Sequence, residues 1–333
     1  MTSDRAIVVE VTRGELVESI HRVAACAVDA AGREIYSAGD VEMLVYLRST
    51  AKPFIAAAAI EAGAREAFGL DEREIAVMAA SHFGEPMHVE AVRSILRKIG
   101  MDVSDLRCGT HPPYDDGSAK ALLLAGERPT ALHNNCSGKH AGILGLCKLI
   151  GADPATYLSA QNPAQRRILE LCARLSDDDP QTWPIGVDGC GIPVYATTLR
   201  QAARSFARFA SLSEMLDSDA QALRVVRDAM VAHPEYVAGT GQFDTELMRA
   251  GRGALAAKAG AEGVHGVAAI ARGYGYVSKV IDGGSRGRGP SSVAVLRRIG
   301  VLDEPQCAEL ERFAHPAVYN RAGEAVGEIR AIV

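Results

Sequence analysis

The chain has 333 residues, of which 48% are hydrophobic and 23% are charged, a composition typical of a globular protein with a large core. The 36 Lys and Arg residues against 41 Asp and Glu residues give a net charge of −5, and only 5% of residues are aromatic, so a nucleic-acid partner is not expected. No apolar run is long enough to cross a membrane, which excludes a membrane-spanning protein.

The seven cysteines are scattered and odd in number, unlike the disulfide framework of a small secreted protein. The first residues, Met1 to Arg5, lead directly into a strand pattern without the apolar segment of a signal peptide. We therefore expect a cytoplasmic protein whose thiols are free for chemistry or metal binding.

Strand patterns lie near both ends of the chain. Apolar stretches between turn signals predict N-terminal strands over residues 6–11, 17–28 and 34–38. Similar stretches predict C-terminal strands over residues 254–259, 264–271 and 275–281. A glycine-rich loop, 282–290, and a helix over 291–299 follow.

The middle of the chain, from about residue 54 to 255, is mostly helical in pattern. Its predicted helices cover residues 54–64, 71–80, 88–99, 117–126, 138–150, 164–175, 199–210 and 213–233. Strands at both ends predict a mixed α/β (α+β) fold with one antiparallel sheet assembled from both termini. The helical region then packs against that sheet or beside it, and we expect a single domain over residues 1–333.

Ser49 and Lys52 stand at the junction of an apolar run and an alanine-rich helix. A lysine three residues after a serine lies one helical turn away on the same face, so its amine can reach the hydroxyl. A neutral amine there activates the serine as a nucleophile, as in the S-x-x-K motif of penicillin-binding proteins and β-lactamases. The alternative is an N-cap serine followed by a surface lysine.

Two further segments carry candidate catalytic groups. Lys258-Ala-Gly at the end of a predicted strand is similar to the K-T-G element of the same class of serine enzymes, or is a surface lysine before a turn. Ser81 follows a helix in a turn-rich loop, where it either projects into a cleft or caps the next helix.

Two cysteines lie in glycine-flanked segments. Cys136 and Lys139 are one turn apart at the start of a glycine-spaced helix, and Cys190 lies in a tight loop. These cysteines either share a metal that prefers thiolate ligands or are buried free thiols.

Four motifs in order give the chain a resemblance to the class 3, or rhizobial-type, L-asparaginases. They are Arg48-Ser-Thr-Ala-Lys-Pro53, Ala80-Ser-His-Phe-Gly-Glu85, Asn134-Asn-Cys-Ser-Gly-Lys-His140 and Val187-Asp-Gly-Cys-Gly-Ile-Pro193. The resemblance implies a serine β-lactamase-like fold, a homodimer, and hydrolysis of L-asparagine to L-aspartate and ammonia.

The resemblance also implies functions for individual residues. The two Ser-Lys tandems of the family correspond to Ser49 with Lys52 and Ser81 with Lys258. A zinc ion would be held by Cys136, Lys139 and Cys190, with the lysine bound as a neutral amine. Substrate contacts would come from four residues that adjoin these motifs: Arg48, His82, Asn135 and Asp188.

The residues support a covalent mechanism in which one serine attacks the side-chain amide, releases ammonia and forms an ester that water hydrolyses. Ser49 is the favoured nucleophile, because its lysine is one turn away. A glutaminase is the alternative enzyme, since its substrate differs by one methylene. A penicillin-binding or β-lactamase activity is disfavoured because the serine–x–asparagine element of those enzymes is not evident. A non-catalytic metal-binding protein on the same fold is the alternative outside enzymology.

Overall fold

A computed structural model describes residues 6–333, so the prediction about a signal peptide, which concerns Met1 to Arg5, lies outside the described residues. The chain forms two compact units. Unit 1 contains the residues up to Thr50, Thr197–Glu214 and Glu246–Val333, and unit 2 contains Ala51–Ala196 and Met215–Thr245. The sequence analysis predicted a single domain over residues 1–333, and this stays a prediction.

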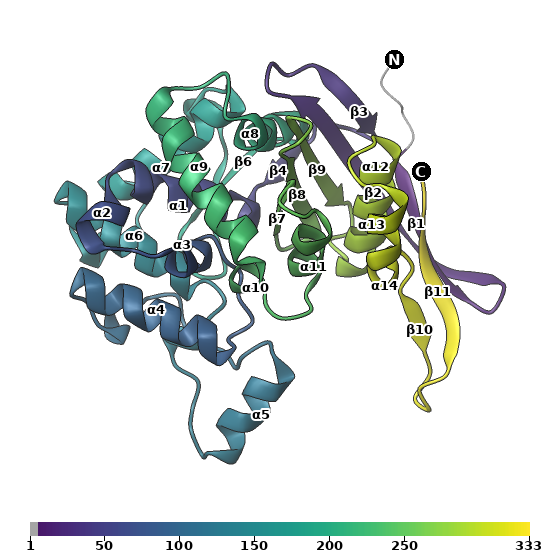
Figure 1. Ribbon diagram of the computed structural model, residues 1–333, viewed down its shortest axis with the longest axis horizontal. Helices are drawn as coiled ribbons and strands as arrows, with labels where there is room; N and C mark the ends of the chain where they lie inside the picture. The colour runs from purple at the N-terminus through teal and green to yellow at the C-terminus, as the bar shows by residue number, and fades with distance from the viewer. Residues whose placement is uncertain (1–5) are drawn as a thin grey trace. The chain divides into compact units, whose positions relative to one another are not determined.

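Unit 1 is built around one antiparallel sheet with the strand order β10-β11-β1-β2-β9-β8-β7, in which β3 also pairs with β2. Its strands are β1 (Ile7–Arg13), β2 (Leu16–Asp29), β3 (Glu34–Ala38), β7 (Leu255–Ala259), β8 (Val264–Ala269), β9 (Tyr274–Val280), β10 (Ala317–Tyr319) and β11 (Ala325–Ile332). Because β1 pairs with β11, the first and last strands lie side by side (Figure 1). The prediction of one antiparallel sheet built from both termini is confirmed, although the sequence analysis missed β10 and β11.

The other elements of unit 1 are short segments and helices. They are β4 (Leu44–Tyr46), η1 (Arg48–Ala51), α8 (Leu199–Ser211), η6 (Ser285–Gly287), α12 (Arg288–Arg298), α13 (Glu304–Glu309) and α14 (Glu311–Ala314). α11 (Phe243–Ala250) begins in unit 2 and ends in unit 1.

Helices cover both faces of the sheet. α8 approaches Gly275 of β9 so closely that a Cβ there would lie 2.1 Å from Ala203 O. The next residue, Tyr276, points to the opposite face, because successive strand residues alternate. There its hydroxyl lies 3.5 Å from Ser292 Oγ of α12. The sheet is therefore buried on both sides over β8 and β9.

Unit 2 is mainly helical. Its elements are α1 (Lys52–Glu61), α2 (Ala64–Phe68), α3 (Glu72–Met78), α4 (Pro86–Ile99), η2 (Val103–Asp105), α5 (Asp116–Leu124), η3 (Ala131–His133), α6 (Ser137–Ile150), η4 (Pro154–Thr156), α7 (Pro163–Ser176), η5 (Pro180–Thr182), β5 (Ile185–Val187), α9 (Asp217–Ala232) and α10 (Pro234–Val237). Strand β6 (Pro193–Thr198) begins in unit 2 and ends in unit 1. All eight predicted helices of the middle region are present, seven of them in unit 2 and α8 in unit 1. The sequence analysis missed the short elements α2, α10, β5 and β6.

Helix α1 forms the centre of unit 2. Its residues from Lys52 to Ile60 are all buried, and it packs against α9, α6, α7 and α3. A helix that is buried on every side must be apolar on every side, which explains its alanine-rich sequence. The buried lysine at its first position is the exception, and it begins the candidate site. None of the described helices combines the length and apolar character needed to cross a bilayer.

Helix α6 depends on a glycine for its approach to α3. A Cβ at Gly138 would lie 2.1 Å from the carbonyl oxygen of Val77. A Cβ at Gly145, two turns later in the same helix, would lie 3.5 Å from side-chain atoms of Ile99 and Phe68. Packing therefore requires a glycine at position 138 and does not require one at position 145.

We expect Gly138→Ala to lower the free energy of unfolding by at least about 2 kcal/mol, because the backbone of α3 must move. Gly145→Ala, the matched control, should be neutral or stabilise by up to about 1 kcal/mol through its higher helix propensity. Urea unfolding of both variants measures this, and equal stability of the two would contradict the packing argument.

Candidate active site

The Lys52 amine lies among polar atoms at the start of α1. The residue is 1% exposed. Its Nζ lies 2.6 Å from Ala80 O, 2.9 Å from Ser81 Oγ and 3.4 Å from Asn135 O. Ser81 follows α3 and Asn135 precedes α6, so three separate segments of unit 2 meet at this amine.

The surroundings of Lys52 favour its neutral form. Burial lowers the pKa of its amine, and the nearby positive charge of Lys139 acts in the same direction. The sulfurs of Cys136 and Cys190 oppose this shift, yet the net pKa is lowered. Lys52 therefore has the property that a lysine needs in order to act as a base.

Cys136, Lys139 and Cys190 meet beside Lys52, as the sequence analysis expected of a shared site. Lys139 Nζ donates to Cys190 Sγ at 2.9 Å, and a hydrogen bond joins the two sulfurs. That hydrogen bond lowers the pKa of Cys136, with help from the charges of Lys139 and Lys52, and it raises the pKa of Cys190. Burial lowers the pKa of Lys139, but the two sulfurs outweigh it and the net pKa is raised. These directions favour a thiolate on Cys136 beside an ammonium on Lys139 when no metal is bound.

This donor set suits a soft metal ion if the lysine gives up its proton. The described residues contain no group of three His, Cys, Asp or Glu side chains arranged to hold a metal. Two cysteines with a lysine fall outside that type of site, and their atoms already converge on one point. Two thiolates and an amine are ligands that zinc accepts. These three side chains are therefore compatible with the predicted zinc ion, and zinc binding stays a prediction.

The other predicted substrate contacts in unit 2 differ in exposure. Asp188 is half-buried, and its Oδ1 accepts from the N–H of Gly189 at 2.7 Å. The backbone N–H of Asn135 donates to His111 Nε2 at 3.0 Å. His82 is 0% exposed, and both of its ring nitrogens lie within hydrogen-bond distance of protein atoms.

Ser49, Arg48 and Lys258 lie in unit 1. Ser49 is in η1, next to Arg48, whose φ of 49° is left-handed and costs a non-glycine residue about 1–3 kcal/mol. Lys258 is 1% exposed and donates to Ala259 O at 2.6 Å. A Cβ at Gly260 would lie 3.2 Å from Thr50 Cγ2, so the segment after Lys258 contacts the segment that carries Ser49.

The contact of Lys52 with Ser81 is the feature that sequence reasoning missed. The sequence analysis paired Lys52 with Ser49 and Ser81 with Lys258. The two residues in contact are 29 positions apart, and no local pattern links them. Ser137, which hydrogen bonds with His82 at 2.9 Å, was also missed.

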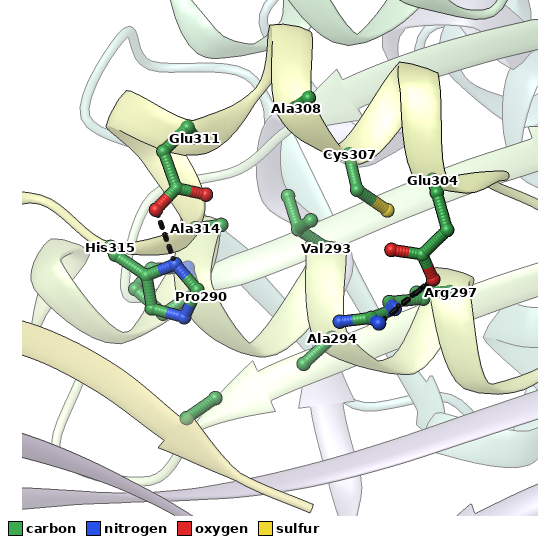
Figure 2. A pocket seen from close by; sticks show the side chains of 11 residues that line it. Pro290, Val293, Ala294, Arg297, Glu304, Cys307, Ala308, Glu311, Ala314 and His315 are labelled. Carbon is green, nitrogen blue, oxygen red and sulfur yellow. Dashed lines mark hydrogen bonds and ion pairs between the residues drawn. The ribbon is translucent and has the colours of Figure 1, made fainter.

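A separate pocket in unit 1 contains no predicted site residue (Figure 2). It has a volume of about 310 Å³ and lies among α12, α13 and α14. Two ion pairs face it, Arg297 with Glu304 at 2.8 Å and His315 with Glu311 at 3.0 Å. Burial raises the pKa of Cys307 in this pocket, so its thiol is not an activated nucleophile. The unit 2 cluster is therefore the stronger candidate.

Comparisons with known proteins were made for the whole chain. A sequence model of the L-asparaginase II family matches residues 9–331. No curated protein was found to match the chain. The crystal structure of Mglu in its native form in the presence of 4.3 M NaCl is 16% identical, with a TM-score of 0.44, over 84% of this chain and 60% of that chain. A second crystal structure of Mglu is 15% identical, with a TM-score of 0.36, over 85% and 68% of the two chains. The present chain thus spans about 60% of the length of the first of these proteins.

Three buried histidines of unit 2 should make the fold sensitive to acid. Burial lowers the pKa of His82, His88 and His140 below the ordinary value of 6.5. Below that pH the unfolded chain binds protons at these positions that the folded chain does not bind. The free energy of unfolding should therefore fall as the pH falls, by up to about 1.4 kcal/mol per pH unit for each histidine.

Urea unfolding between about pH 8 and pH 5.5 measures this dependence. His88→Gln should flatten it, because one of the three proton sites is removed. An unchanged slope in His88→Gln would show that this histidine does not contribute.

Proposed function

The chain belongs to the L-asparaginase II family, in line with the class 3 resemblance of its motifs, and from that membership we propose that it hydrolyses L-asparagine to L-aspartate and ammonia. The family supports an amidohydrolase of the asparaginase type. The observation that carries the proposal further is the buried Lys52 amine beside the Ser81 hydroxyl at 2.9 Å. A buried base next to a hydroxyl is what covalent hydrolysis of an amide requires.

The neighbours of Lys52 determine which group can donate a hydrogen bond to the lone pair of its neutral amine. Ala80 O and Asn135 O are acceptors only, and a Cys136 thiolate is an acceptor as well. Ser81 is the group among these four that can donate a hydrogen bond. When Lys52 is neutral, its lone pair therefore accepts the proton of Ser81, and its N–H groups serve the acceptors.

The backbone around Ser81 favours a proton-carrying function for this serine. Its N–H donates to Val237 O at 2.9 Å, and the N–H of His82 donates to Asn135 O at 3.2 Å. If Ser81 attacked the amide, neither N–H would be available to stabilise the oxyanion that forms on the substrate's carbonyl oxygen. We therefore keep Ser49 as the proposed nucleophile and assign to Ser81 the transfer of protons to and from Lys52.

In the proposed reaction, Ser49 Oγ forms a bond with the side-chain carbonyl carbon of asparagine, and its proton passes to the Lys52–Ser81 pair. The C–N bond then breaks, and the same pair returns the proton to the leaving ammonia. Water hydrolyses the resulting ester and restores Ser49. Lys258, the second lysine of the predicted tandems, stays the predicted partner of Ser81.

We propose three of the other predicted residues, Arg48, Asp188 and Asn135, as contacts for the substrate. Arg48 would bind the α-carboxylate bidentately, and Asp188 would pair with the α-ammonium. Asn135 would donate through its side-chain amide. The predicted homodimer, β-lactamase-like fold and cytoplasmic location stay predictions.

We also propose that Cys136, Lys139 and Cys190 hold a zinc ion. When bound, the ion would supply a fixed positive charge that orients or polarises the substrate. Lys139 would bind as a neutral amine, so metal and proton compete for it.

An ammonia-release assay with L-asparagine and L-glutamine tests the proposed activity. We expect release from asparagine, and faster release from glutamine would favour the glutaminase alternative.

Ser49→Ala should abolish both turnover and the covalent adduct detected by mass spectrometry. Ser81→Ala should lower kcat by about 100-fold or more, because proton transfer is lost, while an adduct on Ser49 still forms. Ser213→Ala, an exposed hydroxyl, is the control. An adduct that survives Ser49→Ala would overturn the assignment.

Metal analysis of the purified protein tests the zinc proposal. We expect one zinc per chain, lost in Cys136→Ala and in Cys190→Ala. Cys172→Ala removes a buried thiol of α7 and should retain the metal. Equal zinc content in all variants would contradict the proposed ligands, whether or not the protein is active.

A further inference from the structure

The backbone N–H and both ring nitrogens of His82 are hydrogen bonded to protein atoms. Its backbone N–H donates to Asn135 O at 3.2 Å. Its Nδ1 accepts from the N–H of Gly84 at 3.2 Å, and its Nε2 lies 2.9 Å from Ser137 Oγ. Because the side chain is 0% exposed, no water replaces these partners.

The partners of His82 define its tautomer. The Gly84 N–H can only donate, so Nδ1 must carry the lone pair. The hydroxyl of Ser137 donates its hydrogen to Leu132 O at 3.0 Å. Its oxygen is therefore the acceptor in the hydrogen bond with His82, and His82 Nε2–H is the donor. A proton on Nδ1 would place two donors face to face. His82 is therefore neutral, with the hydrogen on Nε2.

We propose that His82 is a positioning residue that holds Ser81 against Lys52, instead of a contact for the substrate. This inference rests on the proposed function of the Lys52–Ser81 pair. His82 directly follows Ser81 in the chain and ties that segment to the turn before α6 at Asn135 and Ser137. Asn135 O also accepts from Lys52 Nζ at 3.4 Å. One carbonyl oxygen thus sets the positions of both members of the pair.

The same contacts exclude a direct interaction with substrate. Both ring nitrogens are already hydrogen bonded, and the ring stacks on His88 at a centroid distance of 5.0 Å and an angle of 14°. A substrate atom would have to displace Ser137 or Gly84 to reach the imidazole. His82 consequently acts through the position of Ser81.

Steady-state kinetics with asparagine distinguish the two functions. His82→Leu removes both ring hydrogen bonds and should lower kcat by about 100-fold while KM changes by less than about threefold. His82→Gln can still place an N–H near Ser137 Oγ and should recover most of that loss. A rise in KM at unchanged kcat would show a substrate contact and overturn the proposal.

A matched control separates positioning from loss of stability. His88 is also a buried histidine, with Nε2 2.8 Å from Glu235 O, and it stacks on His82 but makes no hydrogen bond to Asn135. His88→Gln should lower the urea midpoint as His82→Gln does, and leave kcat within about twofold of its original value. A loss of kcat in His88→Gln as large as in His82→Leu would contradict a specific function of His82. If His82→Leu does not fold, Ser137→Ala replaces it and should also lower kcat at constant KM.

NMR of the ¹⁵N-labelled protein tests the geometry without reference to catalysis. We expect one protonated ring nitrogen on His82, Nε2, at neutral pH, and a shifted Nε2–H signal in Ser137→Ala. An Nδ1–H tautomer or an imidazolium would overturn the proposal. If the protein hydrolyses neither asparagine nor glutamine, the proposed function fails while this result still decides the state of His82.

Discussion

The burial of a lysine amine at the first position of an apolar helix is the constraint on which the site of unit 2 depends. An ammonium ion in this place would lose its hydration, so burial drives Lys52 towards the neutral amine. A neutral amine still needs partners for two N–H groups and one lone pair. The carbonyls of Ala80 and Asn135 accept from it, and the hydroxyl of Ser81 is able to donate to it. The segments that end α3 and begin α6 must therefore meet at the first residue of α1.

The charges beside Lys52 are arranged so that it can stay neutral. The lowered pKa of Cys136 favours a thiolate, whose charge an ammonium on Lys139 would balance, and the hydrogen bond from Cys190 acts in the same direction. If both lysines were protonated, two ammonium groups would share a buried space with one thiolate. Burial makes that state costly, and the opposite shifts of the two lysines, with the pKa of Lys139 raised and that of Lys52 lowered, favour the proton on Lys139. The same arrangement gives the two cysteines and Lys139 the convergence that a soft metal requires.

Close approaches of backbone segments set these distances. Gly138 lets α6 approach the carbonyl of Val77 in α3. The start of α6 carries Cys136, its N-cap residue, and Ser137, its first residue. The histidine that follows Ser81 is tied to that same helix start. Small changes in the packing of α6 on α3 would thus move a thiolate, a hydroxyl and a carbonyl together. The site is a property of helix packing more than of any single loop.

The sequence by itself determined most of the elements, and its motifs selected the candidate site residues. Periodicity located α4 and α7, which bury one regular apolar face, and runs of apolar or small residues located α1 and α6, which are buried on nearly every side. It missed β10, a three-residue strand at the edge of the sheet, and β11, in which only Ile329 is buried. Motifs selected Lys52, Ser81, Cys136, Lys139 and Cys190, since reactive residue types at fixed spacing are visible in one dimension. The tertiary structure alone decided that Lys52 contacts Ser81 and that His82 is fully enclosed. Those contacts join residues far apart in the chain, and only the packed helices bring their atoms within hydrogen-bond distance.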